Sequence, residues 1–251
     1  MNTVLLVAGW KSVSLVDVHG YSSFTLWLCG CNLKCPFCHN WRIANNDSSL
    51  CKPMSVDSIV EEVYASRILV DFLHVTGGEP LLQHGGLAYL FQRTRDLGIR
   101  NSLNSNLTLS NALRALLERD LVDHVATDLK IPPQELYGVP AAPHLWAEFL
   151  ESLKTIKEHG VTLELRIPVY KKLTPALLGK YLEEIVDLVS TSNTVVILNQ
   201  LLGEPFVTPR DPSWCKENCN VDPGLLEDLA NALKSRGFSR VIIKSIPGFQ
   251  R

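Results

Sequence analysis

No stretch of about 18 consecutive apolar residues occurs in the sequence, so no membrane-spanning helix is expected. The apolar start at Val4–Val7 is short and lacks a preceding basic segment, unlike a signal peptide. Basic and acidic residues nearly balance, at 24 against 26, which excludes a strongly basic chain that coats nucleic acid through charge alone. We therefore expect a cytoplasmic protein with no membrane partner. Nucleic acid is not an expected partner either, although local contact with RNA stays open.

Repeats, low-complexity tracts and long runs of one charge are also absent. Charged residues make up 20% of the chain and hydrophobic residues 46%, which is not the composition of a disordered segment. A chain of 251 residues can bury roughly 70–75% of the surface that it exposes when unfolded. It can thus form one sizeable core, and α/β barrels commonly occupy this length as a single domain.

Short β-rich segments alternate with helical patterns along the chain. Strands are predicted at 24–28, 72–75, 100–104, 122–127, 161–170, 194–200 and 240–244, and helices at 56–69, 87–97, 109–119, 144–159, 175–189 and 224–236. The alternation is typical of parallel βαβ units, which predicts an α/β fold with a complete or partial (β/α) barrel. A doubly wound open sheet is the alternative. In both architectures ligands bind at the carboxyl ends of the strands.

Seven cysteines are present, and four of them fall within ten residues. Because no secretion signal is expected, clustered thiolates indicate metal or iron–sulfur ligands rather than a disulfide framework. Cys31, Cys35 and Cys38 form a C-x3-C-x2-C loop directly after the first strongly predicted strand. A structural zinc and a four-iron cluster each usually take four protein ligands. Three cysteines without a clear fourth therefore predict an iron left open for a substrate; a zinc site or buried thiols are the alternatives.

This spacing resembles the signature of the radical S-adenosylmethionine (SAM) superfamily, and Phe37 matches the aromatic residue that commonly precedes the third cysteine. The resemblance implies that Cys31, Cys35 and Cys38 hold a [4Fe–4S] cluster whose fourth iron is chelated by SAM. It also implies a partial (β/α)6 barrel, in agreement with the alternation of strands and helices. The cluster and SAM are thus the expected cofactors, and a reductant such as flavodoxin or ferredoxin is an expected partner.

Polar or glycine-rich motifs follow the next two predicted strands. Gly77 and Gly78 allow backbone to approach a ligand closely. With Glu79 they resemble the GGE motif of the superfamily, which implies contact with the methionyl amino group of SAM, although Glu79 could instead brace the loop. Asn104 and Asn106 follow the 100–104 strand, where they could bond a ribose or a carboxylate, or cap the next helix.

Charged residues mark two later strands. Alternation places Asp128 and Lys130 on one face, where they could meet a zwitterion or each other, and the segment is similar to a DLK triplet in glycyl-radical-enzyme activating enzymes. Arg166 lies between apolar residues in a strand and needs a partner there. Its guanidinium suits a carboxylate such as that of SAM, and an ion pair with Glu164 or Glu79 is the alternative.

Two further segments indicate which group of enzymes within the superfamily the chain resembles. His39-Asn40 completes a CHN motif, and residues 14–17 (SLVD) resemble the opening of activators of anaerobic ribonucleotide reductase. His19 and Trp41 stand where these enzymes usually have proline, so the identity of the partner enzyme stays open. The resemblance implies hydrogen abstraction from a glycine of a partner enzyme. Radical modification of a small molecule, a peptide or an RNA base is the alternative, and a zinc-binding interaction module is a remote one.

Four cysteines lie outside the C-x3-C-x2-C loop. Cys29 is expected to be a small buried thiol, or an alternative ligand. Cys51, Cys215 and Cys219 could together bind a second metal centre, the last two could form a disulfide, or all three could be structural thiols, which we favour because a fourth ligand is not evident. We expect a barrel core over residues 1–205 and an extension over 206–251 that packs on the same domain.

Overall fold

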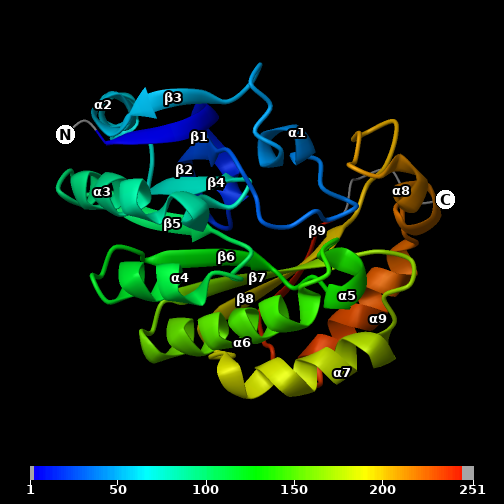
Figure 1. Cartoon of the computed structure of the whole chain (residues 1–251). Helices are drawn as coiled ribbons and strands as arrows, with labels where there is room; N and C mark the ends of the chain where they lie inside the picture. The colour runs from blue at the N-terminus through cyan, green and yellow to red at the C-terminus, as the bar shows by residue number, and fades with distance from the viewer. Residues whose placement is uncertain (1–2, 245–251) are drawn as a thin grey trace. The chain divides into compact units, whose positions relative to one another are not determined.

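Residues 3–244 are described by the structure, which is a computed structural model (Figure 1). The chain divides into two compact units. Unit 1 comprises Met1–Asn32 and Asn40–Ala126, and unit 2 comprises Leu33–His39 and Thr127–Arg251. The cysteine loop therefore contributes Cys31 to unit 1 and its other two cysteines to unit 2. The expected boundary after residue 205 stays a prediction.

Unit 1 is built on strands that are mostly parallel. Its strands are β1 (Val4–Val18), β2 (Tyr21–Leu28), β3 (Lys52–Ser55), β4 (Phe72–Gly77), β5 (Arg100–Asn104) and the first three residues of β6 (His124–Asp128). Strand β1 pairs antiparallel with both β2 and β3. Strands β2, β4, β5 and β6 pair parallel in that order, so their carboxyl ends share one edge.

Helices connect the parallel strands of unit 1. They are α1 (Trp41–Ala44), α2 (Val56–Ser66), the 3-10 helix η1 (Pro80–Gln83), α3 (His84–Arg95) and α4 (Ser110–Leu117). Helix α2 begins where the Ser55 hydroxyl accepts a hydrogen bond from the Ser58 amide at 3.1 Å. Its apolar residues recur at helical spacing and are buried, which packs this helix against the sheet.

Unit 2 repeats the strand–helix alternation. Its elements are α5 (Pro133–Leu136), α6 (Ala142–Glu158), β7 (Thr162–Val169), α7 (Pro175–Ile185), the 3-10 helix η2 (Val186–Leu188), β8 (Thr194–Gln200), α8 (Pro212–Asn218), α9 (Pro223–Lys234) and β9 (Val241–Lys244). Strands β7, β8 and β9 are parallel in that order. Helices α6, α7 and α9 are the long helices of this unit (Figure 1). Helix α7 begins at Pro175, with the Thr174 hydroxyl as its cap.

A row of polar side chains fixes the register of three strands in unit 1. His74 of β4, Ser102 of β5 and His124 of β6 are register partners across the sheet, and all three are buried. The Ser102 hydroxyl bonds Nδ1 of His74 at 2.7 Å and Nδ1 of His124 at 2.8 Å. A slip of one residue would break both of these buried hydrogen bonds, so the row specifies the pairing.

The predicted fold class is confirmed: the chain is a mixed α/β protein with a parallel sheet, and within each unit the described strands form an open row rather than a closed barrel. Each of the seven predicted strands overlaps a strand of the structure. The sequence did not predict the long β1 or the short β3, α1 and α8. No helix among residues 3–244 has the length and hydropathy needed to cross a membrane.

Candidate active site

Cys31 lies in the loop that follows β2, and the backbone of this loop is fixed on two sides. The Gly30 amide donates to the Ile43 carbonyl at 3.0 Å, and the Gly30 carbonyl accepts from the Glu79 amide at 2.7 Å. Gly30 has a φ of 87°, a conformation that favours glycine. The first cysteine therefore leaves the sheet from a rigid position beside the end of β4.

The two glycines after β4 are required by this close packing. A Cβ on Gly77 would collide with the backbone of Leu28, and a Cβ on Gly78 with the carbonyl oxygen of Gly30. The Gly78 amide donates to the Leu28 carbonyl at 2.8 Å. The space that these glycines leave open is thus filled by the chain itself, while contact of this backbone with SAM stays a prediction.

Glu79 is fully buried, and both of its carboxylate oxygens are engaged within unit 1. Oε1 accepts from the Leu81 amide at 3.0 Å and from the Ser105 hydroxyl at 2.8 Å. Oε2 accepts from the Asn106 amide at 2.6 Å. These are the contacts of a brace between the loops after β4 and β5, the second of the two roles considered for this residue.

Asn104 at the end of β5 and Asn106 just beyond it both point to other protein groups. Asn104 donates from Nδ2 to the Thr76 hydroxyl at 2.9 Å. Asn106 donates from Nδ2 to Oδ1 of Asn32 at 2.8 Å and faces the sulfur of Cys31 at 3.9 Å. Neither side chain caps α4, whose N-cap is Leu109 with no side-chain hydrogen bond, so the capping alternative considered for them does not hold. Binding of ribose or carboxylate by these residues is not tested by the structure.

Cys35 and Cys38 are held within unit 2 by backbone hydrogen bonds. The Cys38 amide donates to the Cys35 carbonyl at 3.2 Å, which folds the loop into a turn. The amides of Arg210 and Asp211 donate to the carbonyls of Cys38 at 3.0 Å and Pro36 at 2.9 Å. The segment before α8 therefore lies alongside the loop that carries these two cysteines.

Phe37 is packed against an aromatic group that the sequence did not single out as a site residue. Its ring lies 6.1 Å from that of Trp214, which in turn lies 5.7 Å from Tyr170. The indole nitrogen of Trp214 donates to Oε1 of Glu135 at 3.1 Å. A tryptophan in a proline-rich segment was the only sequence signal for this contact, and it did not indicate its partner.

Charged residues form one ion pair at the carboxyl end of β6 and another within β7. Nζ of Lys130 lies 3.0 Å from Oδ2 of Asp128, and Nε of Arg166 lies 2.6 Å from Oε1 of Glu164. Burial raises the pKa of Asp128, but the charges of Lys130 and Arg166 outweigh it and hold that pKa below its ordinary value. Both ion pairs were considered as alternatives to SAM binding, and in this structure they are formed.

His39 follows the third cysteine and interacts electrostatically with Asp128. Burial lowers the pKa of His39 below its ordinary value, and the negative charge of Asp128 offsets part of this effect. The imidazole is therefore mainly neutral at neutral pH. A neutral ring next to the cysteine loop can accept or donate one hydrogen bond without adding charge.

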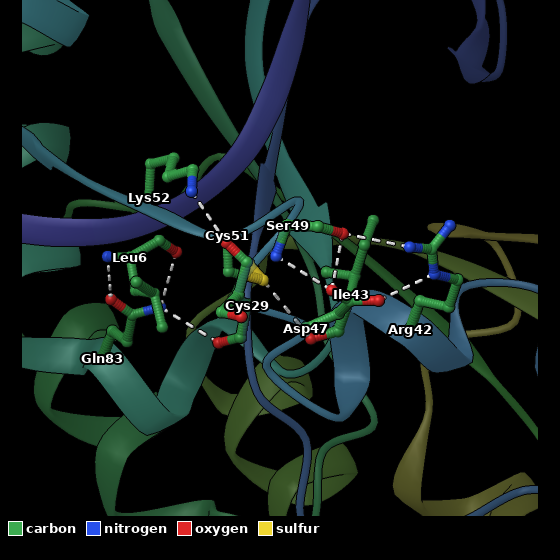
Figure 2. Close-up of a disulfide and its surroundings, with 10 residues drawn as sticks. Leu6, Cys29, Arg42, Ile43, Asp47, Ser49, Cys51, Lys52 and Gln83 are labelled. Atoms are coloured by element: carbon green, nitrogen blue, oxygen red, sulfur yellow. Dashed lines mark hydrogen bonds and ion pairs between the residues drawn. A yellow bond between two sulfur atoms is a disulfide. The ribbon is translucent and has the colours of Figure 1, made fainter.

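Four cysteines form disulfides: the Cys29–Cys51 pair corrects the expectation that these two are thiols or metal ligands, and the Cys215–Cys219 pair is the disulfide alternative rather than the favoured structural thiols. Cys29 pairs with Cys51, and Cys215 pairs with Cys219 (Figure 2 shows the first pair). Strand β1 lies between β2 and β3. Its Val7 pairs with Leu28, the residue before Cys29, and with Lys52, the residue after Cys51. This strand order, which is not visible in the sequence, brings the first pair together. The second pair lies about one helical turn apart, near the end of α8.

The remaining three cysteines are those of the C-x3-C-x2-C loop, and none of them is in a disulfide. Thiolates are the ligands that iron–sulfur clusters take, so this donor set fits a [4Fe–4S] cluster with one iron left for another ligand. Asn106 adds a hydrogen-bond donor directed at one of the sulfurs. The residues present thus fit the group that the sequence predicted.

An α/β chain that presents three reduced cysteines after a parallel strand defines a class of cofactor-dependent enzyme. The sequence profile of the radical SAM superfamily matches residues 26–189, and the chain belongs to this superfamily. It is therefore a radical SAM enzyme, and the family implies both predicted cofactors, a [4Fe–4S] cluster and SAM.

Curated relatives match part of the chain. A protein of Methanocaldococcus jannaschii whose name assigns it to the glycyl-radical enzyme activating enzymes is 29% identical over 125 residues, 50% of each chain. The 7-carboxy-7-deazaguanine synthase of Hyperthermus butylicus is 35% identical over 115 residues, 42% of this chain and 44% of that protein. The chain thus spans about half the length of the curated relatives that it matches, or less.

A solved structure supports the fold. The radical S-adenosylmethionine methyltransferase TsrM from Kitasatospora setae matches with a TM-score of 0.62 over 90% of this chain and 54% of that chain. Sequence identity is 14%, so the likeness concerns the fold alone. It agrees with the partial barrel predicted from the strand–helix alternation.

Proposed function

We propose that this protein is an activating enzyme that removes a hydrogen atom from a glycine Cα in the backbone of a partner enzyme. One structural observation carries the cofactor chemistry: the three cysteines of the loop stay reduced while the other four pair as disulfides. The choice of substrate is supported by the CHN motif and by the relative named as an activating enzyme.

When bound, the cluster and SAM supply a radical that can take a hydrogen atom from an unactivated carbon. In the proposed reaction, Cys31, Cys35 and Cys38 hold the cluster as thiolates. An electron from flavodoxin or ferredoxin and one molecule of SAM are consumed, and methionine and 5′-deoxyadenosine leave. The abstracted hydrogen atom ends on the 5′ carbon, and the glycine keeps the unpaired electron.

The charged residues at the end of β6 and within β7 are suited to the amino acid part of SAM. Asp128 is ionised at neutral pH because its pKa lies below its ordinary value, so it can accept a hydrogen bond from an ammonium group. Arg166 and Lys130 carry positive charges that can meet a carboxylate. We propose that the existing ion pairs of these residues hold them in place until SAM binds.

A second substrate class is supported by the similarity to 7-carboxy-7-deazaguanine synthase. In that case the same cofactor chemistry acts on a small molecule, and no partner polypeptide is needed. The cysteine loop and its supporting contacts would be unchanged, because specificity depends on the loops that surround a shared fold.

The experiment combines the anaerobically reconstituted enzyme with SAM, a reductant and a glycyl radical enzyme from the same organism. We expect the electron paramagnetic resonance signal of a glycyl radical in the partner, with a matching amount of 5′-deoxyadenosine. The Cys31→Ala variant is the control and should give neither. Production of 7-carboxy-7-deazaguanine from the substrate of that synthase, with no radical in the partner, would support the second class and overturn the first.

A further inference from the structure

The side-chain amide of Asn106 has a defined orientation. Its Oδ1 accepts from the backbone amide of Thr108 at 3.0 Å and from the Thr108 hydroxyl at 2.6 Å. A backbone N–H can only donate, so the atom that faces it is the carbonyl oxygen of the amide. The other end of the amide is therefore NH2, and its two hydrogens face Oδ1 of Asn32 and the sulfur of Cys31.

This orientation is locked by buried neighbours. The Asn106 backbone amide donates to the buried carboxylate of Glu79 at 2.6 Å. Asn32 donates from its own Nδ2 to the Thr108 hydroxyl at 2.8 Å, which closes a ring of three side chains. Asn106 is 8% exposed, so water competes little for its hydrogens. A donor that is held in place and shielded from water needs no reorganisation to form a hydrogen bond to the sulfur.

Every donor and acceptor of this side-chain amide already has a partner within the protein. Its NH2 group has two hydrogens and two acceptors, and its carbonyl has two lone pairs and two donors. Binding of a ribose or carboxylate by the same amide would break part of this ring. The contacts therefore direct Asn106 towards the cysteine rather than towards SAM.

We propose that Asn106 is a positioning residue that donates a hydrogen bond to the Cys31 thiolate and raises the reduction potential of the bound cluster. Hydrogen bonds to the sulfurs are one of the factors that set such potentials. A donor withdraws negative charge from the thiolate, and this stabilises the reduced, more negative cluster. The separation of 3.9 Å places the amide at the outer limit for a bond to sulfur, and the negative charge of a thiolate strengthens the attraction. The inference rests on a cluster bound at Cys31 but not on the identity of the substrate.

The test is a redox titration of the reconstituted cluster without SAM, followed by electron paramagnetic resonance. At the midpoint potential of the wild type, we expect Asn106→Ala and Asn106→Asp to lower the ratio of reduced to oxidised cluster about threefold or more, given the usual strength of one hydrogen bond. Asn104→Ala is the matched control: it removes the same group two residues earlier, where the partner is Thr76, and should leave the ratio unchanged.

A measurement on the wild type covers the case in which the variants do not take up a cluster. With asparagine labelled by nitrogen-15 at Nδ2, electron–nuclear double resonance on the reduced cluster should detect a coupling to that nitrogen. Absence of the coupling would overturn the proposal. Variants that keep the wild-type potential and a full cluster, but bind SAM more weakly, would overturn it as well and make Asn106 a ligand of SAM. Neither result depends on whether a glycyl radical is formed.

Discussion

The cysteines of the loop are restrained in different ways in the two units. Beside Cys31 in unit 1, the backbone hydrogen bonds of Gly30 are supplemented by a side-chain network, in which Asn106 faces the Cys31 sulfur and buried Glu79 holds Asn106. Cys35 and Cys38 in unit 2 are held by backbone hydrogen bonds from residues 210 and 211 and by packing of the loop against Trp214. Side-chain contacts can be deleted one at a time, whereas backbone contacts persist through most substitutions. Unit 1 should therefore be the more sensitive to single substitutions.

The largest effect in this comparison is expected at Gly78. Gly78→Ala places a methyl group against the Gly30 carbonyl, next to the loop that carries Cys31. Overpacking of this kind costs about 1–3 kcal/mol or more in stability, and we expect cluster content to fall with it. Gly85→Ala is the control, because a Cβ there meets nothing within 4 Å and alanine favours a helix. Denaturant unfolding and iron analysis give both readouts; equal stability of the two variants would contradict the account.

A smaller loss is expected for Glu79→Gln. Both carboxylate oxygens face backbone amides, of Leu81 and Asn106, so an amide nitrogen would oppose a donor in either orientation. One unsatisfied buried group costs about 1–3 kcal/mol of the free energy of unfolding. Glu61→Gln changes an exposed carboxylate in the same way and should stay within about 0.5 kcal/mol of the wild type. Equal unfolding curves for the two variants would show that Glu79 is not a brace.

Unit 2 offers a matched pair of tryptophans. Trp214→Phe removes the hydrogen bond to Glu135 and weakens the contact with Phe37, and Trp146→Phe removes a bond of 2.9 Å to Glu184 on α7. Each should cost about 1 kcal/mol of stability. Only Trp214→Phe should speed the release of iron to a chelator, by a few-fold, because only Trp214 packs against the cysteine loop. Equal release rates in both variants would contradict this assignment.

The smallest effect is expected from pH. The pKa of Asp128 in the folded chain lies below its ordinary value of 3.8, because the charges of Lys130 and Arg166 outweigh the effect of burial. The resulting stability is complete above pH 3.8 and is lost as the pH falls through the lower folded pKa. In the cluster-free protein, the free energy of unfolding should thus fall less steeply between about pH 5 and about pH 2 for Asp128→Asn than for the wild type. Parallel curves would rule out this contribution.

Local patterns sufficed for much of the fold. Helices α2, α7 and α9 have apolar residues at helical spacing; the first two begin at their predicted first residues, 56 and 175, and α9 begins one residue before its predicted start, at 223. The strands of the parallel sheet are short apolar runs between these helices, so their positions followed. Strand β1 was not predicted, and its pairing shifts between Val7 and Gly9 and again between Lys11 and Ser14. Such bulges break the two-residue alternation from which a strand is predicted.

The features of the candidate site also fall into two groups: those that a local sequence pattern predicts and those that it does not. The spacing of Cys31, Cys35 and Cys38 is a local pattern, and it indicated the family that the profile match confirms. The Cys29–Cys51 disulfide and the contact of Phe37 with Trp214 join residues far apart in sequence. Whether Glu79 and Asn106 face a ligand or each other is a choice among several partners, and residue type alone does not determine it.

The central claim is that the three cysteines of the loop, and not the disulfide cysteines, hold the cluster. Iron, sulfide and SAM-dependent paramagnetic resonance changes should be measured side by side in five anaerobically reconstituted variants and the wild type. The wild type and Cys215→Ala/Cys219→Ala should each carry about four irons and respond to SAM, with unchanged zinc. Cys31→Ala, Cys35→Ala and Cys38→Ala should each lose the cluster, and Cys29→Ala/Cys51→Ala should retain it. A full cluster in all three single variants, or a loss of four irons from the Cys215→Ala/Cys219→Ala protein, would contradict the account.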